Sequence, residues 1–285
     1  MGIRAQAVNM RICFLTVRRV PPVESPLLIE VYRILESGGF EVESSIAEER
    51  VTRPDLLRPE HDLYVLKSHT ELSLSLAGIL HGEGALILSP YPACATAQNK
   101  IITSRRLRAA GVPIPDCWVT GRPAQMGRAA QERPLILKPY LGHRGEGIMR
   151  AESPDDLLAM PEPGSPLLIQ HYVLGPGEDL KVYVVGEEVF AVRKPFSGDS
   201  FTRAGRPCPV SDEVRRIALD AGRALGLGLY GLDVVEAPAG PVVVDVNYFP
   251  GYKGVAGAAP LVAAYIEAYA RGEVDLSAHP RETVI

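Results

Sequence analysis

Three oxygen-bearing side chains near the C-terminus are the clearest candidates for chemistry. Two runs of apolar and β-branched residues, 232–235 and 242–246, are separated by prolines and a glycine, which predicts a β-hairpin. Side chains alternate between the two faces of a strand, so Asp245 and Asn247 share one face. Asp233 lies in the partner strand, where a register beside Asp245 is allowed but not required.

These three side chains predict a site for a divalent cation. A carboxylate in so apolar a strand is costly unless a positive charge compensates it. Carboxylate and amide oxygens, completed by water and by nucleotide phosphates, suit Mg²⁺ (or Mn²⁺). The alternative is that the acids face water at a sheet edge, which is the common fate of a single Asp. Two Asp and one Asn at this spacing favour the metal.

A second predicted hairpin, residues 179–194, carries candidate anion-binding side chains. It turns at residues 186–187, so Lys181 near one end and Arg193 with Lys194 near the other are expected to converge. Such cations suit an anionic substrate or the γ-phosphate of a nucleotide. The alternative is that one or two of them face solvent. In the glycine- and proline-rich stretch that follows, Arg203 and Arg206 are open candidates for substrate contact.

Two lysines and a glycine-rich loop lie upstream of these hairpins. Lys100 belongs to a predicted helix that starts near residue 97 and ends at Gly111, and Lys138 ends an apolar strand. The following loop contains glycines that let backbone N–H groups approach phosphate oxygens. The loop lacks the G-K-[ST] ending of a Walker A motif, and a strand pattern follows it. The glycines are Gly142, Gly145 and Gly147.

Composition limits the class of protein and its partners. The chain of 285 residues is 46% hydrophobic and 22% charged, which is typical of a globular protein with two or three lobes. A net charge of -4 argues against nucleic acid or an anionic membrane as a partner. The four cysteines form no C-x-x-C pair, and no stretch resembles a signal peptide or a membrane span. We expect a soluble cytoplasmic protein that starts at Met1 or Met10.

The chain up to about residue 95 alternates strand and helix patterns. This order predicts a small α/β domain with a largely parallel sheet. The predicted strands are 11–17, 40–46, 62–67 and 85–88, and the predicted helices are 24–37 and 72–81.

Together these motifs resemble the ATP-grasp superfamily over most of the chain. The hairpin end DVNYFPGYKGV is similar to the metal-binding end of that fold, and the helix with Lys100 leads into a similar G-V-P-I-P turn. The strand, glycine loop and strand of LILKPYLGHRGEGIM resemble the flap that covers ATP. The resemblance implies an α/β (α+β) ATP-grasp fold with an N-terminal domain at 1–95, a central lobe at 96–180 and a C-terminal lobe at 181–285.

The resemblance also implies roles for individual residues. Lys100 would reach the phosphates of ATP, which the glycine loop would cover. The residues themselves add that Lys138 supplies complementary positive charge, and that the convergence of Lys181 and Arg193 predicts catalytic roles for both. The strand at 166–173 corresponds to the segment that reads adenine, followed by an acid that contacts ribose. Its residues here are Gln170, His171, Tyr172, Val173 and, as the acid, Glu178.

The reaction is open between branches of the superfamily. The helix with Lys100, the glycine loop and D-L-K-V-Y-V-V-G resemble RimK-type ligases, which join a carboxylate to an amine through an acyl phosphate. Those ligases usually carry Glu-x-Asn where this chain has Asp245-Val246-Asn247, and the following F-P-G-Y is closer to inositol trisphosphate kinases. We interpret the chain as an ATP- and Mg²⁺-dependent ligase acting on an anionic small molecule or peptide. A small-molecule kinase and a non-catalytic nucleotide sensor are the alternatives, and a homo-oligomer is open.

Overall fold

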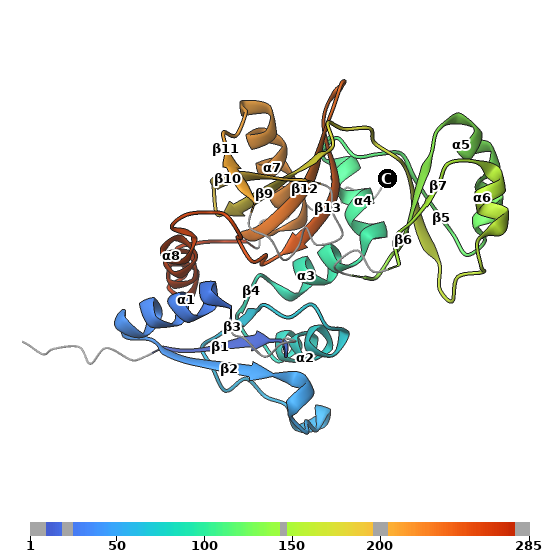
Figure 1. The fold of residues 1–285 in the computed structure, drawn as a ribbon. Coiled ribbons are helices and arrows are strands. Elements are labelled where there is room, and N and C mark those ends of the chain that lie inside the picture. Colours follow the sequence, from blue (N-terminus) through green and yellow to red (C-terminus); the bar gives the residue numbers. More distant parts are fainter. Residues whose placement is uncertain (1–9, 19–24, 143–146, 196–204, 277–285) are drawn as a thin grey trace, which may run out of the picture. The chain divides into compact units, whose positions relative to one another are not determined.

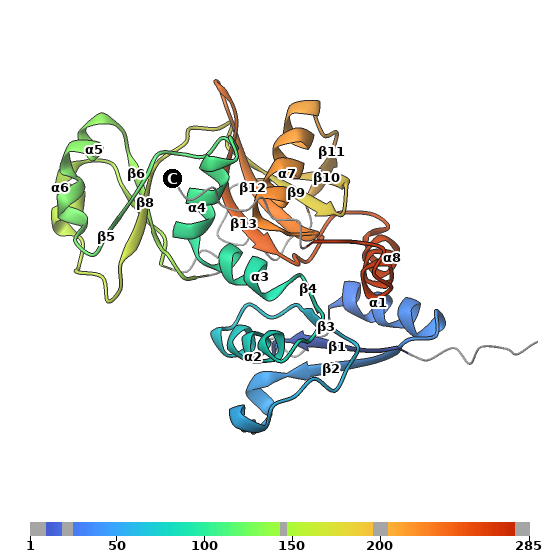
Figure 2. The same ribbon diagram turned by 180° about the vertical axis from the view of Figure 1, so that it is seen from behind.

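The computed structural model describes residues 10–18, 25–142, 147–195 and 205–276 (Figures 1 and 2). The chain divides into two units by its internal contacts. One contains the described residues up to Cys94 together with those from Ala256 onward, and the other contains Ala95–Val255. No helix in these described ranges is long and apolar enough to cross a membrane.

The first unit is built on a four-stranded parallel sheet in the order β2-β1-β3-β4 (Figure 1). The strand and helix alternation predicted from the sequence is therefore confirmed. The strands are β1 (Arg11–Thr16), β2 (Glu41–Ile46), β3 (Leu63–Leu66) and β4 (Ile87–Leu88). The helices are α1 (Pro26–Ser37), α2 (Glu71–Gly82) and α8 (Ala258–Ala270), with short 3-10 turns η1 (Ala47–Glu49) and η2 (Pro54–Leu56).

Helix α8 belongs to this unit although it comes from the far end of the sequence. It packs against α1, and the Tyr269 hydroxyl donates a hydrogen bond to the carbonyl of Ile87 in β4 at 3.1 Å. Residues 256–276 of the expected C-terminal lobe, 181–285, thus group with the N-terminal unit by their contacts. Helix α8 belongs to the N-terminal unit because its apolar side chains, such as Val262 and Ile266, are buried there.

The second unit contains a four-stranded antiparallel sheet in the order β5-β8-β6-β7. Helices α5 (Gly127–Glu132) and α6 (Pro154–Ala159), with the turn η3 (Pro123–Met126), join one face of it in an apolar core of residues such as Leu137, Ala130 and Leu157. The predicted strand, glycine loop and strand correspond to β6 and β7. The strands are β5 (Cys117–Thr120), β6 (Leu135–Pro139), β7 (Met149–Ala151) and β8 (Leu167–His171).

A five-stranded antiparallel sheet, β11-β10-β9-β12-β13, completes the second unit. Both predicted hairpins are present. The one predicted from the runs 232–235 and 242–246 extends beyond those runs at each end. Part of the stretch expected to be a loop instead forms an edge strand, because it pairs with β10. The strands are β9 (Glu178–Val185), β10 (Glu188–Pro195), β11 (Arg206–Cys208), β12 (Leu229–Ala237) and β13 (Gly240–Tyr248).

The helix expected from residue 97 is instead two helices, α3 (Tyr91–Gln98) and α4 (Lys100–Ala109). Asn99 separates them because its backbone is extended and its side chain accepts hydrogen bonds from the N–H groups of Ile101 and Ile102. Asn99 also pairs with Leu141 beside the glycine loop. The break therefore places Lys100 at the first position of α4, next to that loop.

Helix α7 (Asp212–Leu225) packs its apolar face against the five-stranded sheet. The Ser211 hydroxyl caps its first turn by accepting a hydrogen bond from the N–H of Val214, and Gly226 ends it with a left-handed φ of 69°. Tyr230 of β12 is buried beneath the helix, and its hydroxyl donates to the carbonyl of Ala218 at 2.8 Å. The close approach of ring and helix leaves room only for glycine at position 222.

We expect Gly222→Ala to destabilise the protein, because the added Cβ would lie 2.2 Å from the Tyr230 hydroxyl oxygen. Overpacking of this kind costs about 1–3 kcal/mol. Gly127→Ala is the matched control, since its Cβ would meet nothing closer than 3.9 Å and its φ and ψ of -50° and -42° are helical. Urea unfolding followed by circular dichroism measures both, and equal midpoints would contradict the packing.

Candidate functional site

One face of the five-stranded sheet gathers acids and lysines. Directly opposed residues of neighbouring strands point to the same side, and the register pairs Asp233 with Asp245 and with Lys181. Lys194 is opposed to Asp179, which lies two residues before Lys181 in β9. The sequence left open whether Asp233 lies beside Asp245. In the structure these two predicted metal ligands are directly opposed. The polar residues that this register places toward one end of the face are Asp179, Lys181, Lys194, Asp233, Asp245 and Asn247.

Lys181 lies between two carboxylates. Its Nζ is 2.7 Å from Oδ2 of Asp233 and 3.4 Å from Oδ2 of Asp179, and all three side chains are largely buried. Burial by itself would lower the pKa of Lys181, but the two carboxylates outweigh burial and raise that pKa. Burial also raises the pKa of Asp179 against the opposing effect of Lys181. Lys181 is therefore the cation that both carboxylates share.

Lys100 makes the corresponding contact with the other acid of the hairpin. Its Nζ is 3.3 Å from Oδ1 of Asp245 and donates a hydrogen bond to the carbonyl of Gly142 at 3.1 Å. The start of α4 is fixed by the hydrogen bond from the Lys100 N–H to the carbonyl of Tyr140. Lys100 therefore connects the glycine loop to the predicted metal-binding strand.

Lys138 reaches the same hairpin from the four-stranded sheet. Its buried Nζ donates to the carbonyl of Val244 at 3.0 Å. The ladder between β12 and β13 skips Val244, because a bulge after Asp233 shifts the register. Burial lowers the pKa of Lys138, as do Lys100 and Lys181, while the carboxylates of Asp245 and Asp233 raise it.

The predicted metal ligands are of the type that magnesium prefers, but they are too few to complete its coordination shell. Asp233, Asp245 and Asn247 supply hard oxygen donors on one face. Within the described ranges, no group of three or more His, Cys, Asp and Glu residues gathers to hold a metal ion. The protein alone therefore offers an incomplete coordination set, of the kind that nucleotide phosphates and water complete.

Arg193 does not join this cluster. It is opposed to Leu180 rather than to Asp179 or Lys181, so its side chain lies on the other face of the sheet. There its guanidinium forms two hydrogen bonds to the carboxylate of Glu236, one of them 3.0 Å long. The expected convergence of three cations therefore holds for Lys181 and Lys194 but not for Arg193.

Lys194 was among the cations expected to converge on an anion, whereas Asp179 was given no role from the sequence, and both lie on this face. Lys194 is buried, and its pKa is lowered first by burial and then by Lys181 and Lys253. Both residues follow from counting outward along β9 and β10 from the turn at Gly186. That count is the signal that would have identified Lys194 in place of Arg193.

The predicted adenine segment divides between two faces of the four-stranded sheet. Gln170 shares a face with Lys138 and Leu168, and with Lys100 and Asp245 it lines a small cavity. His171 points the other way, and its ring packs edge-on against Trp118 with centroids 4.8 Å apart. Both His171 ring nitrogens are buried without a hydrogen-bond partner in the described structure, and burial lowers its pKa. We therefore assign no ligand contact to the His171 side chain.

The remaining predicted nucleotide residues follow β8 or open β9. The ring of Tyr172 lies 4.0 Å from the guanidinium carbon of Arg150, and Val173 follows it, half-buried. Glu178 opens β9 and lies 3.8 Å from Arg206, on the sheet face opposite Asp179. Arg203 lies outside the described residues.

The glycine loop is described only at its ends, and Gly145 lies outside the described residues. The Gly142 carbonyl accepts from Lys100 at 3.1 Å, as noted above. Gly147 has a φ of 71°, and a Cβ there would lie 2.9 Å from the ring of Pro139. Glycine is therefore required at position 147 for the chain to return from the loop into β7.

Residues 97–264 match the family model of the RimK-like ATP-grasp domain. This chain belongs to the RimK-like ATP-grasp family. The "Probable alpha-L-glutamate ligase" of Haemophilus influenzae (strain PittEE) is 27% identical over 217 residues, which cover 70% of this chain and 72% of that protein.

Solved structures agree with the assignment of the fold. A RimK domain protein ATP-grasp from Sphaerobacter thermophilus DSM 20745 matches with a TM-score of 0.71 at 17% identity, covering 90% of this chain and 99% of that one. The ATP-grasp ligase PsnB, complexed with minimal precursor, Mg and ADP, matches with a TM-score of 0.64 at 20% identity, covering 90% and 96%. The predicted ATP-grasp fold is confirmed.

The ligase interpretation of the sequence is confirmed as well. The chain is an ATP-grasp carboxylate–amine ligase, and its family model and its relatives named as ligases agree on this class.

We expect Lys181→Met to destabilise the folded protein at about pH 7.5 by about 3–5 kcal/mol, because Asp179 and Asp233 lose their shared cation. In the variant, burial raises the pKa of Asp179 without the opposing effect of Lys181, so Asp179 binds a proton more readily in the folded than in the unfolded state. Stability lost at about pH 7.5 should therefore return as the pH falls toward about 5.

The matched control for Lys181→Met is Arg223→Met. That residue also lies 2.7 Å from an Asp, but its side chain is 66% exposed. Arg223→Met should change the free energy of unfolding by no more than about 0.5 kcal/mol at both pH values. Urea unfolding measures the four conditions, and a Lys181→Met deficit that does not depend on pH would contradict the electrostatic account.

Proposed function

We propose that this ligase joins the amino group of an amino acid, with glutamate as the first candidate, to the carboxylate of a peptide or small acid. Relatives named as probable alpha-L-glutamate ligases support glutamate, and PsnB in complex with a precursor supports a peptide acceptor. The observation in this chain that carries the proposal is the sheet face where Lys181 and Lys194 lie beside Asp179 and Asp233. Lysines there suit an anionic acceptor.

The proposed reaction has two steps that balance. A carboxylate oxygen of the acceptor attacks the γ-phosphorus of ATP, which releases ADP and gives an acyl phosphate. The amine nitrogen then attacks the acyl carbon, loses a proton and expels inorganic phosphate. Magnesium, when bound at Asp233, Asp245 and Asn247, would neutralise negative charge on the phosphates.

The lysines of this chain have two proposed states. In the structure Lys100 and Lys181 neutralise Asp245 and Asp233. We propose that bound nucleotide and magnesium take over that compensation, which frees both ammonium groups for phosphate and acceptor oxygens. Lys138, held on the Val244 carbonyl, contributes positive charge from the opposite sheet.

Placement of the enzyme in the cytoplasm is part of the proposal. All four cysteines are free thiols, two of them buried, and the reaction consumes ATP.

We leave Arg193 out of the chemistry, because its guanidinium is bound to Glu236 on the opposite face of the sheet.

We expect ATP with Mg²⁺ to stabilise the protein by about 2.7 kcal/mol at roughly a hundred times the dissociation constant. Mg²⁺ alone should produce little shift, because the protein supplies only part of a coordination set. Asp245→Asn should fold and lose the Mg²⁺-dependent part of the ATP shift. Thermal unfolding measures all three, and a folded protein that shows no shift with ATP and Mg²⁺ would refute nucleotide binding at this site.

We expect turnover when the protein is given ATP, Mg²⁺, glutamate and a carboxylate acceptor, with ADP and inorganic phosphate formed in equal amounts. A screen of amino acids, short peptides and small acids should measure ADP, phosphate and product mass together. Hydroxylamine in place of the amine should trap a hydroxamate, because it captures an acyl phosphate. Asn247→Ala should abolish turnover with the fold retained.

The other outcomes of this screen identify the alternatives. A product heavier by one phosphoryl group, with no free phosphate and no amine required, would indicate a kinase. ATP binding without turnover on any acceptor would indicate a nucleotide sensor. Amide formation with an amino acid other than glutamate would correct the substrate and retain the ligase.

A further inference from the structure

The N-terminal unit contains a cavity of about 350 Å³ that the ligase chemistry does not use. It lies between α2, the segment from η1 to η2 and the face of the parallel sheet that carries Cys13, Leu15 and Tyr64. Every lining residue falls between positions 13 and 80, outside the ATP-grasp match at 97–264. Its volume lies at the lower end of the range for small-ligand sites, which is about 300–1,000 Å³.

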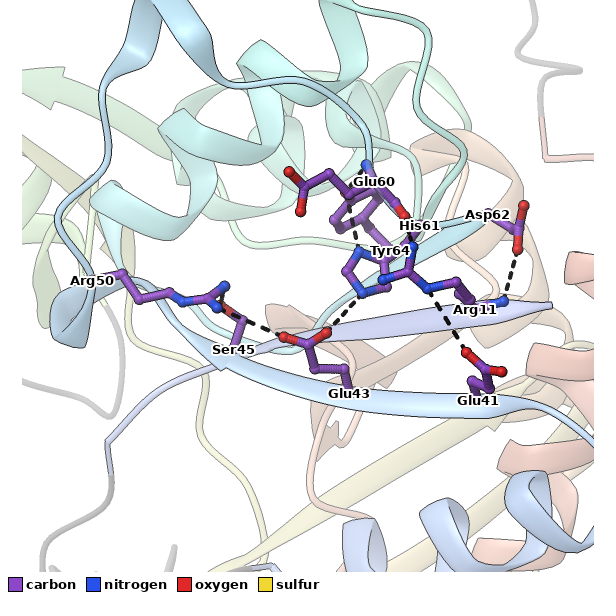
Figure 3. Close-up of polar contacts among 9 residues, drawn as sticks. All are labelled: Arg11, Glu41, Glu43, Ser45, Arg50, Glu60, His61, Asp62 and Tyr64. Atoms are coloured by element: carbon purple, nitrogen blue, oxygen red, sulfur yellow. Dashed lines mark hydrogen bonds and ion pairs between the residues drawn. The ribbon is translucent and has the colours of Figure 1, made fainter. Parts of the chain in front are cut away.

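One wall of this cavity is held by a chain of polar contacts (Figure 3). The Tyr64 hydroxyl accepts a hydrogen bond from the Glu60 N–H at 2.8 Å and lies 3.4 Å from Nδ1 of His61. Nε2 of His61 is 3.0 Å from the carboxylate of Glu43. Figure 3 shows Glu43 lying between His61 and Arg50.

Arg50 ends this chain of contacts at the cavity. Its guanidinium donates to the Ser45 hydroxyl at 3.2 Å and lies 3.8 Å from the second oxygen of Glu43. The guanidinium is thereby oriented by two neighbours while its side chain stays 60% exposed. A guanidinium has five N–H donors, so an oriented and accessible one suits a planar carboxylate.

The charge of the cavity favours an anion. Arg50, Arg53 and Arg58 line it, and Glu60 is the one carboxylate among its lining residues. The floor stays neutral, because burial raises the pKa of the Cys13 thiol to about 12 and also raises the pKa of the Tyr64 hydroxyl. Carboxylates outside the lining pair with the arginines, at 2.6 Å for Arg53 and 3.4 Å for Arg58. Arg50, with the longest carboxylate contact, is the strongest candidate to bind a ligand.

The rest of the lining is apolar. Leu76 and Leu80 of α2 face the cavity, and Val51 and Leu56 also line it with fully or largely exposed side chains. Exposed apolar side chains gain when a ligand removes them from water. A ligand that matches both features has an apolar body and one carboxylate.

We propose that this cavity binds a small apolar carboxylate, with Arg50 as the principal contact to its carboxylate. Two sources share this chemistry: a free N-blocked apolar amino acid, and the C-terminal residue of a peptide. The site is separate from the nucleotide residues, so the proposal does not depend on the proposed ligase substrates.

Isothermal titration calorimetry on the full chain tests the site, with N-acetyl-leucine and N-acetyl-leucinamide as probes. The acid should bind at least about 10-fold more tightly than the amide, because only the acid forms a charge-assisted pair with Arg50. A peptide ending in Gly-Gly-Leu, with a free or amidated C-terminus, forms the second pair of probes. Tighter binding of the acidic peptide than of N-acetyl-leucine identifies a peptide terminus as the source, and weaker binding identifies the free compound.

Arg50→Gln should remove the preference for the acid. Arg33→Gln is the matched control, because Arg33 also lies 3.8 Å from a Glu and is 76% exposed, but on α1 and away from the cavity. Val51→Asp should weaken binding of the acid and Val51→Lys should not, since the exposed Val51 side chain can be replaced without disturbing packing.

Three results would overturn the proposal. They are no binding of either acid at millimolar concentration, equal binding of acid and amide, and a preference for the acid that survives Arg50→Gln. The thermal shift with ATP and Mg²⁺ should be unchanged in Arg50→Gln, which shows that the variant is folded. Absence of the thermal shift with ATP and Mg²⁺ in the unmodified protein would refute the nucleotide site. It would not contradict the proposed carboxylate site.

Discussion

The contact between Lys181 and Asp233 is the interaction on which the candidate site depends. It is a cross-strand pair of 2.7 Å between β9 and β12, and Asp179 shares the same ammonium group. Without it two carboxylates would lie close together in a largely buried position, where mutual repulsion and desolvation would protonate one of them. The register of β9 against β12 therefore places one ammonium group between the two acids.

The second constraint is the bulge after Asp233. A regular ladder would give Val244 a directly opposed partner, but the register passes from Asp245 to Val243. The Val244 carbonyl accepts instead from Lys138 of the four-stranded sheet. A local irregularity in one hairpin thus provides a hydrogen bond between the two sheets, and it uses a buried lysine whose charge also faces Asp245.

Local sequence patterns predicted the elements, while contacts between distant segments decided what the patterns could not. Runs of apolar residues were sufficient to predict both hairpins. The alternation of strand and helix patterns was sufficient to predict the parallel sheet. Arg193 and Lys194 were not separated by the sequence pattern, because the two are neighbours and only the count from the turn distinguishes their faces. The division of one predicted helix at Asn99 depends on a cap and on pairing with Leu141, which local periodicity does not contain. The place of α8 required knowledge of α1.

The pairing of acids with lysines also bears on how metal binding is coupled to nucleotide binding. In the structure each hairpin acid already has a cation, Lys100 for Asp245 and Lys181 for Asp233. A metal ion that displaced these lysines without nucleotide would leave ammonium groups close to a divalent charge, with few protein oxygens to complete its shell. Nucleotide phosphates change both conditions, because they supply metal ligands and accept the displaced lysines. We therefore propose that these two ion pairs couple the binding of the metal to the binding of ATP.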